Sequence, residues 1–347
     1  MPEVQPLLGD LVVGRYPISE EAWGGFWDRL SAKELKPGEA LAVVSALTAR
    51  TPDGESVANL LASLRARNPK PETPPRPTVN IVGTGGGPST FNLSTASAFV
   101  AGAIGARVVK TGSRAYASRT GSVDLLDRLG VPMTSSYDET EDMLERYGMA
   151  CAGAFVYPKE VRLLARAVFP FPMKQVGRFF NLVGPFLGAV PTTAQITGVS
   201  DHSAIPMFRG LADGDTTKRY WIVSNELEAD ELLSIVDADV HDSGGEGPFK
   251  LRPSAIGLAG GTFEELKPVD DLDQTVDHFL RLIGGDGPTA AIESIKLNAG
   301  ALAILGGVAE DWADAFQKAT DAMDAGAPAD LIERLRAHNA SAKAGTA

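Results

Sequence analysis

Cysteine is nearly absent from this 347-residue chain, which contains only Cys151. A single cysteine excludes an internal disulfide, a cysteine-based zinc site and a redox pair. Long apolar runs are absent as well, since none approaches the roughly 18 residues that predict a transmembrane helix. The first ten residues lack the basic region of a signal peptide. We therefore expect a soluble, reduced, cytoplasmic protein.

Positive charge and histidine are also scarce. The chain has 32 Lys and Arg against 44 Asp and Glu, so its net charge is -12 and its pI is near 4.9. An acidic surface repels phosphate backbones and anionic lipid, so we expect neither nucleic acid nor a membrane as a partner. The first of the four histidines is His202. The commonest general base is thus missing from everything before it.

The length suggests two domains, and a proline-rich segment separates them. Residues 71–77 belong to a run with five prolines between Pro69 and Pro77, which blocks both helix and central strand. We predict an N-terminal helical domain over residues 1–70, with a segment near 160–185 packing against it. Residues 78–347 form the second domain.

The N-terminal residues show helical periodicity. Ser19 is the expected N-cap of one helix, whose apolar face is Trp23, Phe26 and Leu30. Pro37 suits the first position of the next helix. This apolar face is large for about 65 residues to bury alone, which favours a second subunit as its cover.

Beyond the linker, short apolar strands alternate with helical stretches, as in a largely parallel sheet covered on both faces. The expected fold class is α/β: a small all-helical domain hinged to a larger α/β domain with a mostly parallel sheet covered by helices. The predicted strands are residues 79–82, 107–110, 151–156, 194–199, 219–223 and 234–237.

A glycine-rich turn, Gly83-Thr84-Gly85-Gly86-Gly87, lies between a predicted strand and a helix. Glycines allow positive φ and let backbone N–H groups approach an anion, which the helix N-terminus also attracts. The pattern is neither the dinucleotide fingerprint nor the Walker pattern, so a structural turn remains an alternative. The next helix opens with three polar side chains where capping needs one. These suit a phosphate or a hydrated cation: Asn92, Ser94 and Thr95.

A basic loop follows the next strand, and neighbouring parallel strands end at one edge of a sheet. Positive charge beside free N–H groups is how polyphosphates are held, although a solvated loop would look the same. Its cations and hydroxyls are Lys110, Thr111, Ser113, Arg114, Ser118 and Arg119.

Asp230 and Glu231 follow a later predicted strand. Adjacent carboxylates are usually solvated, but facing the same crevice they could hold Mg²⁺ together with a substrate phosphate. Cys151 lies in an apolar strand and is expected to be a buried core thiol.

These pieces, in this order, resemble the anthranilate phosphoribosyltransferase family, within a broader group that includes pyrimidine nucleoside phosphorylases. The resemblance covers nearly the whole chain. It is carried by the leading helices and by Gly83-Thr-Gly-Gly86, Thr90-Phe-Asn-Leu-Ser-Thr95, Gly121-Ser-Val-Asp124, Phe180-Asn-Leu-Val-Gly-Pro185, Asp230-Glu231 and Leu297-Asn298-Ala299.

The resemblance implies that 5-phosphoribosyl 1-diphosphate and Mg²⁺ bind between the two domains, and that the N-terminal helices pair two subunits. The metal would meet Ser94, Asp230 and Glu231. The donor's diphosphate and ribose would meet Gly83, Thr84, Gly85, Gly86, Asn92, Ser94, Thr95, Lys110, Ser118 and Arg119.

The acceptor half departs from the family pattern. The family's Lys-His-Gly-Asn-Arg motif is here Lys110-Thr111-Gly112-Ser113-Arg114, and a second family histidine is missing. The arginine that pairs with the anthranilate carboxylate falls near Phe171, and Arg178 could replace it only with a register shift. Thr111, Ser113, Phe171 and Arg178 are therefore the candidate acceptor residues.

We thus expect an Mg²⁺-dependent phosphoribosyltransferase acting on an aromatic or heteroaromatic acceptor other than anthranilate. The sequence offers no convincing general base, so the catalytic residues stay unassigned. Two alternatives remain: anthranilate phosphoribosyltransferase itself, and a non-catalytic or nucleic-acid-binding relative. A nucleoside phosphorylase is disfavoured by the absence of histidine before His202.

Overall fold

The computed structural model describes residues 6–72, 76–112, 121–245, 247–269, 271 and 273–345. The chain forms two compact units, each built from separate stretches of sequence. The first unit comprises Met1–Pro71, Ala154–Val190 and Pro206–Gly214. The second comprises Glu72–Gly153, Pro191–Ile205 and Asp215–Ala347.

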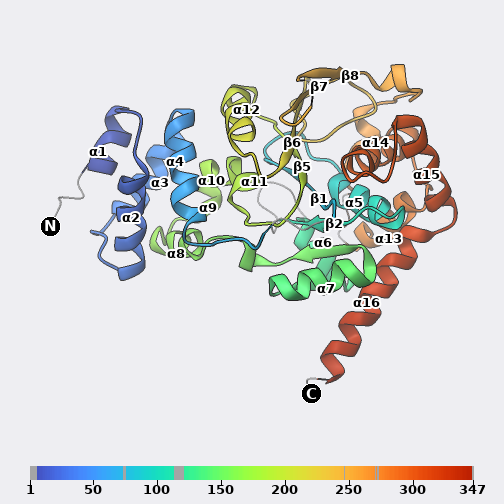
Figure 1. Cartoon of the computed structure of the whole chain (residues 1–347), viewed down its shortest axis with the longest axis horizontal. Coiled ribbons are helices and arrows are strands. Elements are labelled where there is room, and N and C mark those ends of the chain that lie inside the picture. The colour runs from blue at the N-terminus through green and yellow to red at the C-terminus, as the bar shows by residue number, and fades with distance from the viewer. Residues whose placement is uncertain are drawn as a thin grey trace. The chain divides into compact units, whose positions relative to one another are not determined.

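The first unit is helical in the part that the structure describes (Figure 1). Four helices come from its N-terminal stretch: α1 (Pro6–Val13), α2 (Glu20–Ala32), α3 (Glu39–Ala49) and α4 (Gly54–Arg65). The later stretches add a 3₁₀ turn, η1 (Ala154–Val156), and α8 (Lys159–Ala167), α9 (Met173–Val176), α10 (Arg178–Leu182), α11 (Gly184–Leu187) and α12 (Ile205–Gly214).

Helix α2 begins where the sequence predicts, because the Ser19 side chain accepts a hydrogen bond from the N–H of Ala22 at 3.3 Å. Trp23 and Phe26 are completely buried, and Leu30 is 6% exposed. Helices α4 and α8 pack against α2. One chain therefore covers this apolar face by itself, and the expectation that it needs a second subunit as its cover is wrong.

The start of α3 also differs from the prediction. Gly38 is the N-cap residue with φ of 81°, and the helix begins at Glu39. Pro37 thus lies in the turn before the helix. The side chain of Glu39 accepts the N–H of Lys36 at 3.0 Å and pairs with Arg29 of α2, which favours the later start.

The second unit is built on an eight-stranded sheet in the order β3-β4-β2-β1-β5-β6-β7-β8. Strands β1 to β6 pair in parallel, whereas β7 and β8 form an antiparallel edge. The prediction of a mostly parallel sheet is confirmed. The strands are β1 (Val79–Gly83), β2 (Val108–Lys110), β3 (Met133–Thr134), β4 (Met149–Ala152), β5 (Ala194–Gly198), β6 (Arg219–Asn225), β7 (Ala238–Asp242) and β8 (Phe249–Leu251).

Two strand predictions need correction. The strand expected over 151–156 is β4 followed by η1; the chain turns at Gly153, where a Cβ would lie 2.4 Å from the carbonyl oxygen of Thr134. The strand expected over 234–237 is instead a turn before β7, because the Ser234 N–H and hydroxyl bond to Ser294 and Ala290 rather than to a strand.

The helices of the second unit cover this sheet. Helix α14 is buried along most of its length, packs against α5, and both contact β1. The helices are α5 (Leu93–Ala103), α6 (Ser122–Leu129), α7 (Tyr137–Tyr147), α13 (Thr275–Ile283), α14 (Thr289–Leu305), α15 (Trp312–Asp324) and α16 (Ala327–Gly345).

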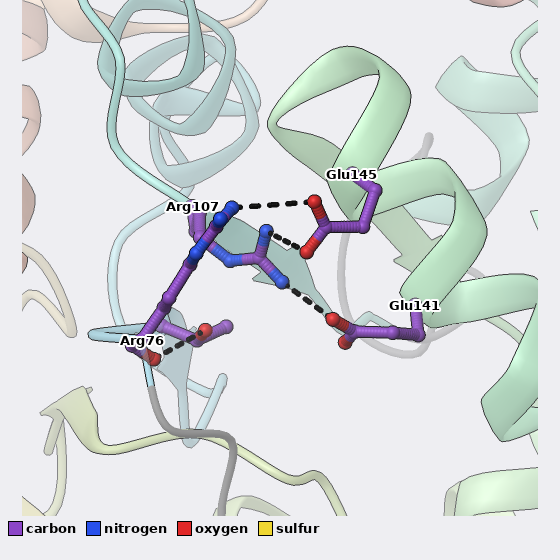
Figure 2. A network of polar contacts seen from close by, with 5 residues as sticks. Arg76, Arg107, Glu141 and Glu145 are labelled. Atoms are coloured by element: carbon purple, nitrogen blue, oxygen red, sulfur yellow. Dashed lines mark hydrogen bonds and ion pairs between the residues drawn. The ribbon is translucent and has the colours of Figure 1, made fainter.

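An ion-pair network lies where the chain enters strands β1 and β2 of this sheet (Figure 2). Arg107, just before β2, donates to Glu141 at 2.8 Å and to Glu145 at 2.9 Å, both on α7. Arg76, just before β1, reaches the other oxygen of Glu145 at 3.2 Å. The network therefore ties the starts of two adjacent strands to one helix.

Among the described residues, no helix is both long enough and apolar enough to cross a membrane.

Candidate functional site

Three parallel strands end side by side in the second unit, and the candidate site is built on the loops that follow them. Gly83 of β1 pairs with Gly198 of β5, which pairs with Val223 of β6. Because the strands run in parallel, the glycine loop after β1 and the acidic loop after β6 leave the sheet at the same edge. The sequence left open whether Asp230 and Glu231 face the glycine loop, and the structure places the two loops side by side.

Glycines allow the acidic loop to cross this edge closely. A Cβ on Gly83 would lie 2.0 Å from Oδ2 of Asp230, and one on Gly198 would lie 1.8 Å from its carbonyl oxygen. A Cβ on Gly87 would lie 2.3 Å from the carbonyl oxygen of Glu228. Any side chain at these positions would push the acidic loop away.

Both carboxylates accept hydrogen bonds from the stretch that runs from the glycine loop to the first turn of α5. Asp230 accepts the N–H of Gly85 at 2.7 Å. Glu231 accepts the N–H of Ser94 at 3.0 Å and the hydroxyl of Thr90 at 2.5 Å. The N–H groups predicted to meet an anion thus meet the protein's own carboxylates.

Burial makes both carboxylates hard to ionise, and the charge of Asp230 adds to the effect on Glu231. Desolvation, followed by the charge of Asp230, raises the pKa of Glu231 to about 8. Desolvation also raises the pKa of Asp230, although the N–H of Gly85 opposes the shift. Two carboxyl groups held together with raised pKa values are typical of a functional site, and a cation would lower both pKa values.

Lys110 is deeply buried at the end of β2, 3% exposed. Its ammonium donates to the carbonyl oxygen of Thr111 at 2.6 Å. Desolvation lowers its pKa to about 8, opposed by the charges of Cys151, Glu231 and Asp230 in that order. Lys110 therefore lies in the electrostatic field of Glu231 and Asp230.

The start of α5 carries the other predicted donor residues. Asn92 is the N-cap residue of this helix. The hydroxyl of Thr95 is buried and has no hydrogen-bond partner in the part of the chain described.

The glycine loop carries the remaining predicted donor residues. The Thr84 hydroxyl lies 3.2 Å from the Ser200 hydroxyl. Gly85 and Gly86 have φ of 68° and 90°, which favours glycine, and both are exposed.

The predicted acceptor residues are not gathered in one unit. Thr111 belongs to the second unit, where it is buried and its hydroxyl accepts from the Asn80 amide at 3.1 Å. Phe171 and Arg178 belong to the first unit, and both are exposed. Ser113, Arg114, Ser118 and Arg119 lie outside the described residues.

Sequence reasoning missed three residues that shape the site. Ser200, after β5, donates its hydroxyl to the carbonyl oxygen of Gly85 at 2.6 Å. Asn225 bonds to the backbone of the acidic loop. Asn298 of α14 bonds to both backbone groups of Leu232. Only Asn298 carried a signal, since it lies within a motif quoted for the family resemblance.

The donor set favours a hard cation. Ser94, Asp230 and Glu231 offer oxygen ligands, which Mg²⁺ prefers. Among the described residues, no three His, Cys, Asp or Glu side chains cluster into a complete metal cage. Mg²⁺ accepts such a partial site, because it keeps waters and takes substrate phosphates as its remaining ligands.

Comparison with known proteins agrees with this geometry. A family model described as "Glycosyl transferase family, a/b domain" matches residues 75–329. Anthranilate phosphoribosyltransferase from Methylobacterium radiotolerans is 32% identical over 343 residues, covering 97% of this chain and 96% of that protein. The enzyme of the same name from Methylorubrum populi is 31% identical over 323 residues, covering 91% and 93%.

Solved structures of similar proteins have the same fold. Anthranilate phosphoribosyltransferase from Thermus thermophilus aligns with a TM-score of 0.79 at 28% identity, covering 96% of this chain and 99% of that one. The Saccharomyces cerevisiae enzyme, in complex with PRPP and Mg, aligns with a TM-score of 0.80 at 20% identity, covering 97% and 98%. The predicted fold class and family resemblance are confirmed. The chain belongs to the glycosyl transferase family that includes the anthranilate phosphoribosyltransferases, a family of pentosyltransferases.

Proposed function

We propose that this protein transfers the 5-phosphoribosyl group from 5-phosphoribosyl 1-diphosphate to an aromatic or heteroaromatic acceptor other than anthranilate, with Mg²⁺ as cofactor. The observation that carries the proposal is that Asp230 accepts a hydrogen bond from Gly85 of the glycine loop, while Glu231 accepts hydrogen bonds from Thr90 and Ser94, which follow that loop. Family membership and the yeast relative in complex with PRPP and Mg support the donor and the cofactor in this proposal, but not the choice of acceptor.

Asp230, Glu231 and the Ser94 hydroxyl would hold Mg²⁺. When bound, the cation neutralises charge on the departing diphosphate. The buried ammonium of Lys110, which lies in the electrostatic field of both carboxylates, would add positive charge to the same site. Preorganised positive charge of this kind lowers the barrier to breaking the bond between C1 and the diphosphate oxygen.

The donor's diphosphate competes with the carboxylates for N–H groups. The N–H groups of Gly85 and Ser94 donate to Asp230 and Glu231. They become available to phosphate oxygens only when the carboxylates turn toward a cation. We therefore propose that the diphosphate and Mg²⁺ bind together, while Gly85 and Gly86 let the loop backbone adjust.

The acceptor proposal rests on residues that differ from the family pattern. By the family resemblance, the cation that pairs with the anthranilate carboxylate falls near Phe171, and Thr111 replaces the histidine of the family's Lys-His-Gly-Asn-Arg motif. A carboxylate without that guanidinium loses a hydrogen bond worth about 1.5–3 kcal/mol. An acceptor that stacks on aromatic rings and carries less negative charge fits these changes better.

The donor half is tested with the double variant Asp230→Asn/Glu231→Gln. It should lose Mg²⁺-dependent diphosphate release, whereas Glu226→Gln, an exposed carboxylate in the same loop, should keep the parent rate. Unchanged Mg²⁺-dependent release in the double variant would remove these carboxylates from the reaction.

The acceptor half is tested by measuring kcat/KM for anthranilate with the unmodified protein, beside a screen of aromatic amines, phenols and heterocycles. We expect poor turnover of anthranilate and release of diphosphate with another acceptor. A kcat/KM of about 10⁴ M⁻¹s⁻¹ or more for anthranilate, the ordinary range for a natural substrate, would contradict the proposal.

Anthranilate phosphoribosyltransferase activity is the second candidate. It is favoured by the relatives at 30–32% identity, which carry that name. In that case Arg178, exposed in the first unit, or another group would pair with the anthranilate carboxylate. Rescue of a tryptophan auxotroph by the parent, lost in Arg178→Ala, would favour this candidate.

We also propose that the protein is a cytoplasmic homodimer that pairs through its N-terminal helices. With the Trp23 face buried inside one chain, support for pairing comes from α1, where Val12 and Val13 are 66% and 61% exposed. A strictly monomeric mass by light scattering at micromolar concentration would contradict the dimer.

A further inference from the structure

Asn225 is the last residue of β6, directly before the acidic loop, and its side chain is almost completely buried. Its amide nitrogen donates to the carbonyl oxygens of Ala229 and Glu231, both at 3.0 Å. Its amide oxygen accepts from the N–H groups of Leu227 and Ala229 at 3.1 and 3.2 Å. A side-chain amide has two donor hydrogens and two acceptor lone pairs. All four are used within one short loop.

These four bonds determine how the loop turns back toward the sheet. The chain must reverse between β6 and Asp230, and Glu228 does so with a φ of 54°, a conformation that residues other than glycine rarely adopt. Asn225 bonds to the residues on both sides of Glu228. The amide therefore compensates for the strained residue and keeps the reversal in one shape.

The loop is also anchored at its ends. The ring of His202, after β5, hydrogen-bonds to the carbonyl oxygen of Asn225 at 2.9 Å. Beyond the carboxylates, Asn298 accepts the N–H of Leu232 at 3.3 Å and donates to its carbonyl oxygen at 2.7 Å. Asp230 and Glu231 thus lie on a backbone fixed on either side. Of these anchors, only Asn225 bonds to the backbone of Glu231 itself.

We propose that Asn225 is the positioning residue that aims the Asp230 and Glu231 carboxylates at a divalent cation, so that the cation affinity of this site depends on its amide. The inference rests on the proposed function, since it takes that cation to be Mg²⁺ bound beside a diphosphate. Asn225 acts through the backbone of the acidic loop and is not itself a ligand. Residues that orient metal ligands in this way typically change metal affinity by about 10- to 100-fold when removed.

The test compares three variants. Asn225→Ala removes all four bonds. Asn225→Ser keeps a hydroxyl that can still accept the N–H of Leu227, as serine does in such turns, but loses the donors to Ala229 and Glu231. Ser234→Ala is the matched control, because it removes a buried hydrogen-bonding hydroxyl from the same segment without touching the backbone of the carboxylates.

The readout is binding, independent of turnover. Inorganic diphosphate is titrated calorimetrically into each protein at a series of fixed Mg²⁺ concentrations, and the Mg²⁺ concentration for half-maximal affinity is recorded with the melting temperature. We expect this concentration to rise about tenfold or more in Asn225→Ala and by less in Asn225→Ser. It should stay at the parent value in Ser234→Ala, even though that variant also melts earlier.

An unchanged Mg²⁺ requirement in Asn225→Ala, with only a lower melting temperature, would overturn the positioning role and leave the proposed function intact. If Asn225→Ala does not fold, an unchanged requirement in Asn225→Ser overturns the role equally. A parent protein that binds diphosphate without any dependence on Mg²⁺ would instead overturn the proposed function, and this inference with it.

Discussion

Gly198 is the residue at which a single added methyl group would disturb the site most directly. It ends β5, pairs with the last residue of β1, and its carbonyl oxygen accepts the N–H of Thr84 at 3.0 Å. A Cβ there would lie 1.8 Å from the carbonyl oxygen of Asp230 and 2.2 Å from its carbonyl carbon. Both are backbone atoms, so no side-chain rotation can relieve the contact. Gly198→Ala must therefore displace the acidic loop.

The size of the effect follows from the geometry. Cβ atoms essentially never approach another heavy atom within 3.0 Å, so the Asp230 carbonyl oxygen must move by at least 1.2 Å from its position at 1.8 Å. Overpacking of this kind costs about 1–3 kcal/mol. The same movement also weakens the exposed hydrogen bond from Gly85 to the Asp230 carboxylate. We expect Gly198→Ala to unfold at a melting temperature several degrees lower.

The matched control is Gly210→Ala. Gly210 lies within α12 and is exposed, and a Cβ added there would meet no neighbouring atom within 4 Å. Alanine is favoured over glycine in a helix by about 0.5–1 kcal/mol, so this variant should be at least as stable as the parent. Melting temperature and the Mg²⁺ requirement for diphosphate binding are measured for both variants. A Gly198→Ala protein that matches the parent in both would refute the steric reasoning.

Three further predictions concern single residues. Glu228→Gly should stabilise the fold by about 0.5–1 kcal/mol, because glycine tolerates the φ of 54° that glutamate holds at a cost; a lower melting temperature would contradict this. Without Mg²⁺, the pKa of Glu231 is about 8 in the folded state, whereas its ordinary value of 4.5 applies in the unfolded state. Between these two pH values the unfolded state has lost the proton that the folded state still holds, so the free energy of unfolding falls as pH rises. The difference in melting temperature between Glu231→Gln and the parent should therefore favour the variant more at pH 8.5 than at pH 5. An equal difference at both pH values would contradict the raised pKa of Glu231. Burial raises the pKa of Cys151 to about 12, so a thiol reagent at pH 8 should label it in urea but not in the native protein.

The sequence was most informative where chemistry and topology coincide. The alternation of strands and helices predicts the parallel sheet, and parallel strands bring the glycine loop and Asp230-Glu231 to one edge. Ser200 and Asn225 could not be found in this way. Each is an ordinary polar residue in the sequence, and each gains its role only when the loop that it bonds to folds back over the sheet.

Burial was the harder property to predict. Trp23 and Phe26 lie on a helix whose apolar face looked too large for its own domain. A segment near 160–185 was expected to pack against this domain, and α8, from the stretch Ala154–Val190 of the same unit, packs on α2. The periodicity of α2 alone does not show that this segment covers Trp23 and Phe26. Lys110 ends a strand and was expected to hold the donor's diphosphate; in the structure its side chain is buried and its ammonium donates to the carbonyl oxygen of Thr111. Its role toward the donor stays a prediction.

The glycine motif has two separate physical tasks. Gly83 and Gly87 lack side chains because the acidic loop passes too close for any Cβ, as it does at Gly198 on the neighbouring strand. Gly85 and Gly86 instead have positive φ and face open space or the far end of Ser200. Gly83 and Gly87 allow the carboxylates to approach the glycine loop, whereas Gly85 and Gly86 allow the loop backbone to change conformation. A phosphate site needs only the second property, whereas a site for phosphate and cation together needs both. The two kinds of glycine within five residues therefore favour a loop that binds the anion and the metal as one unit.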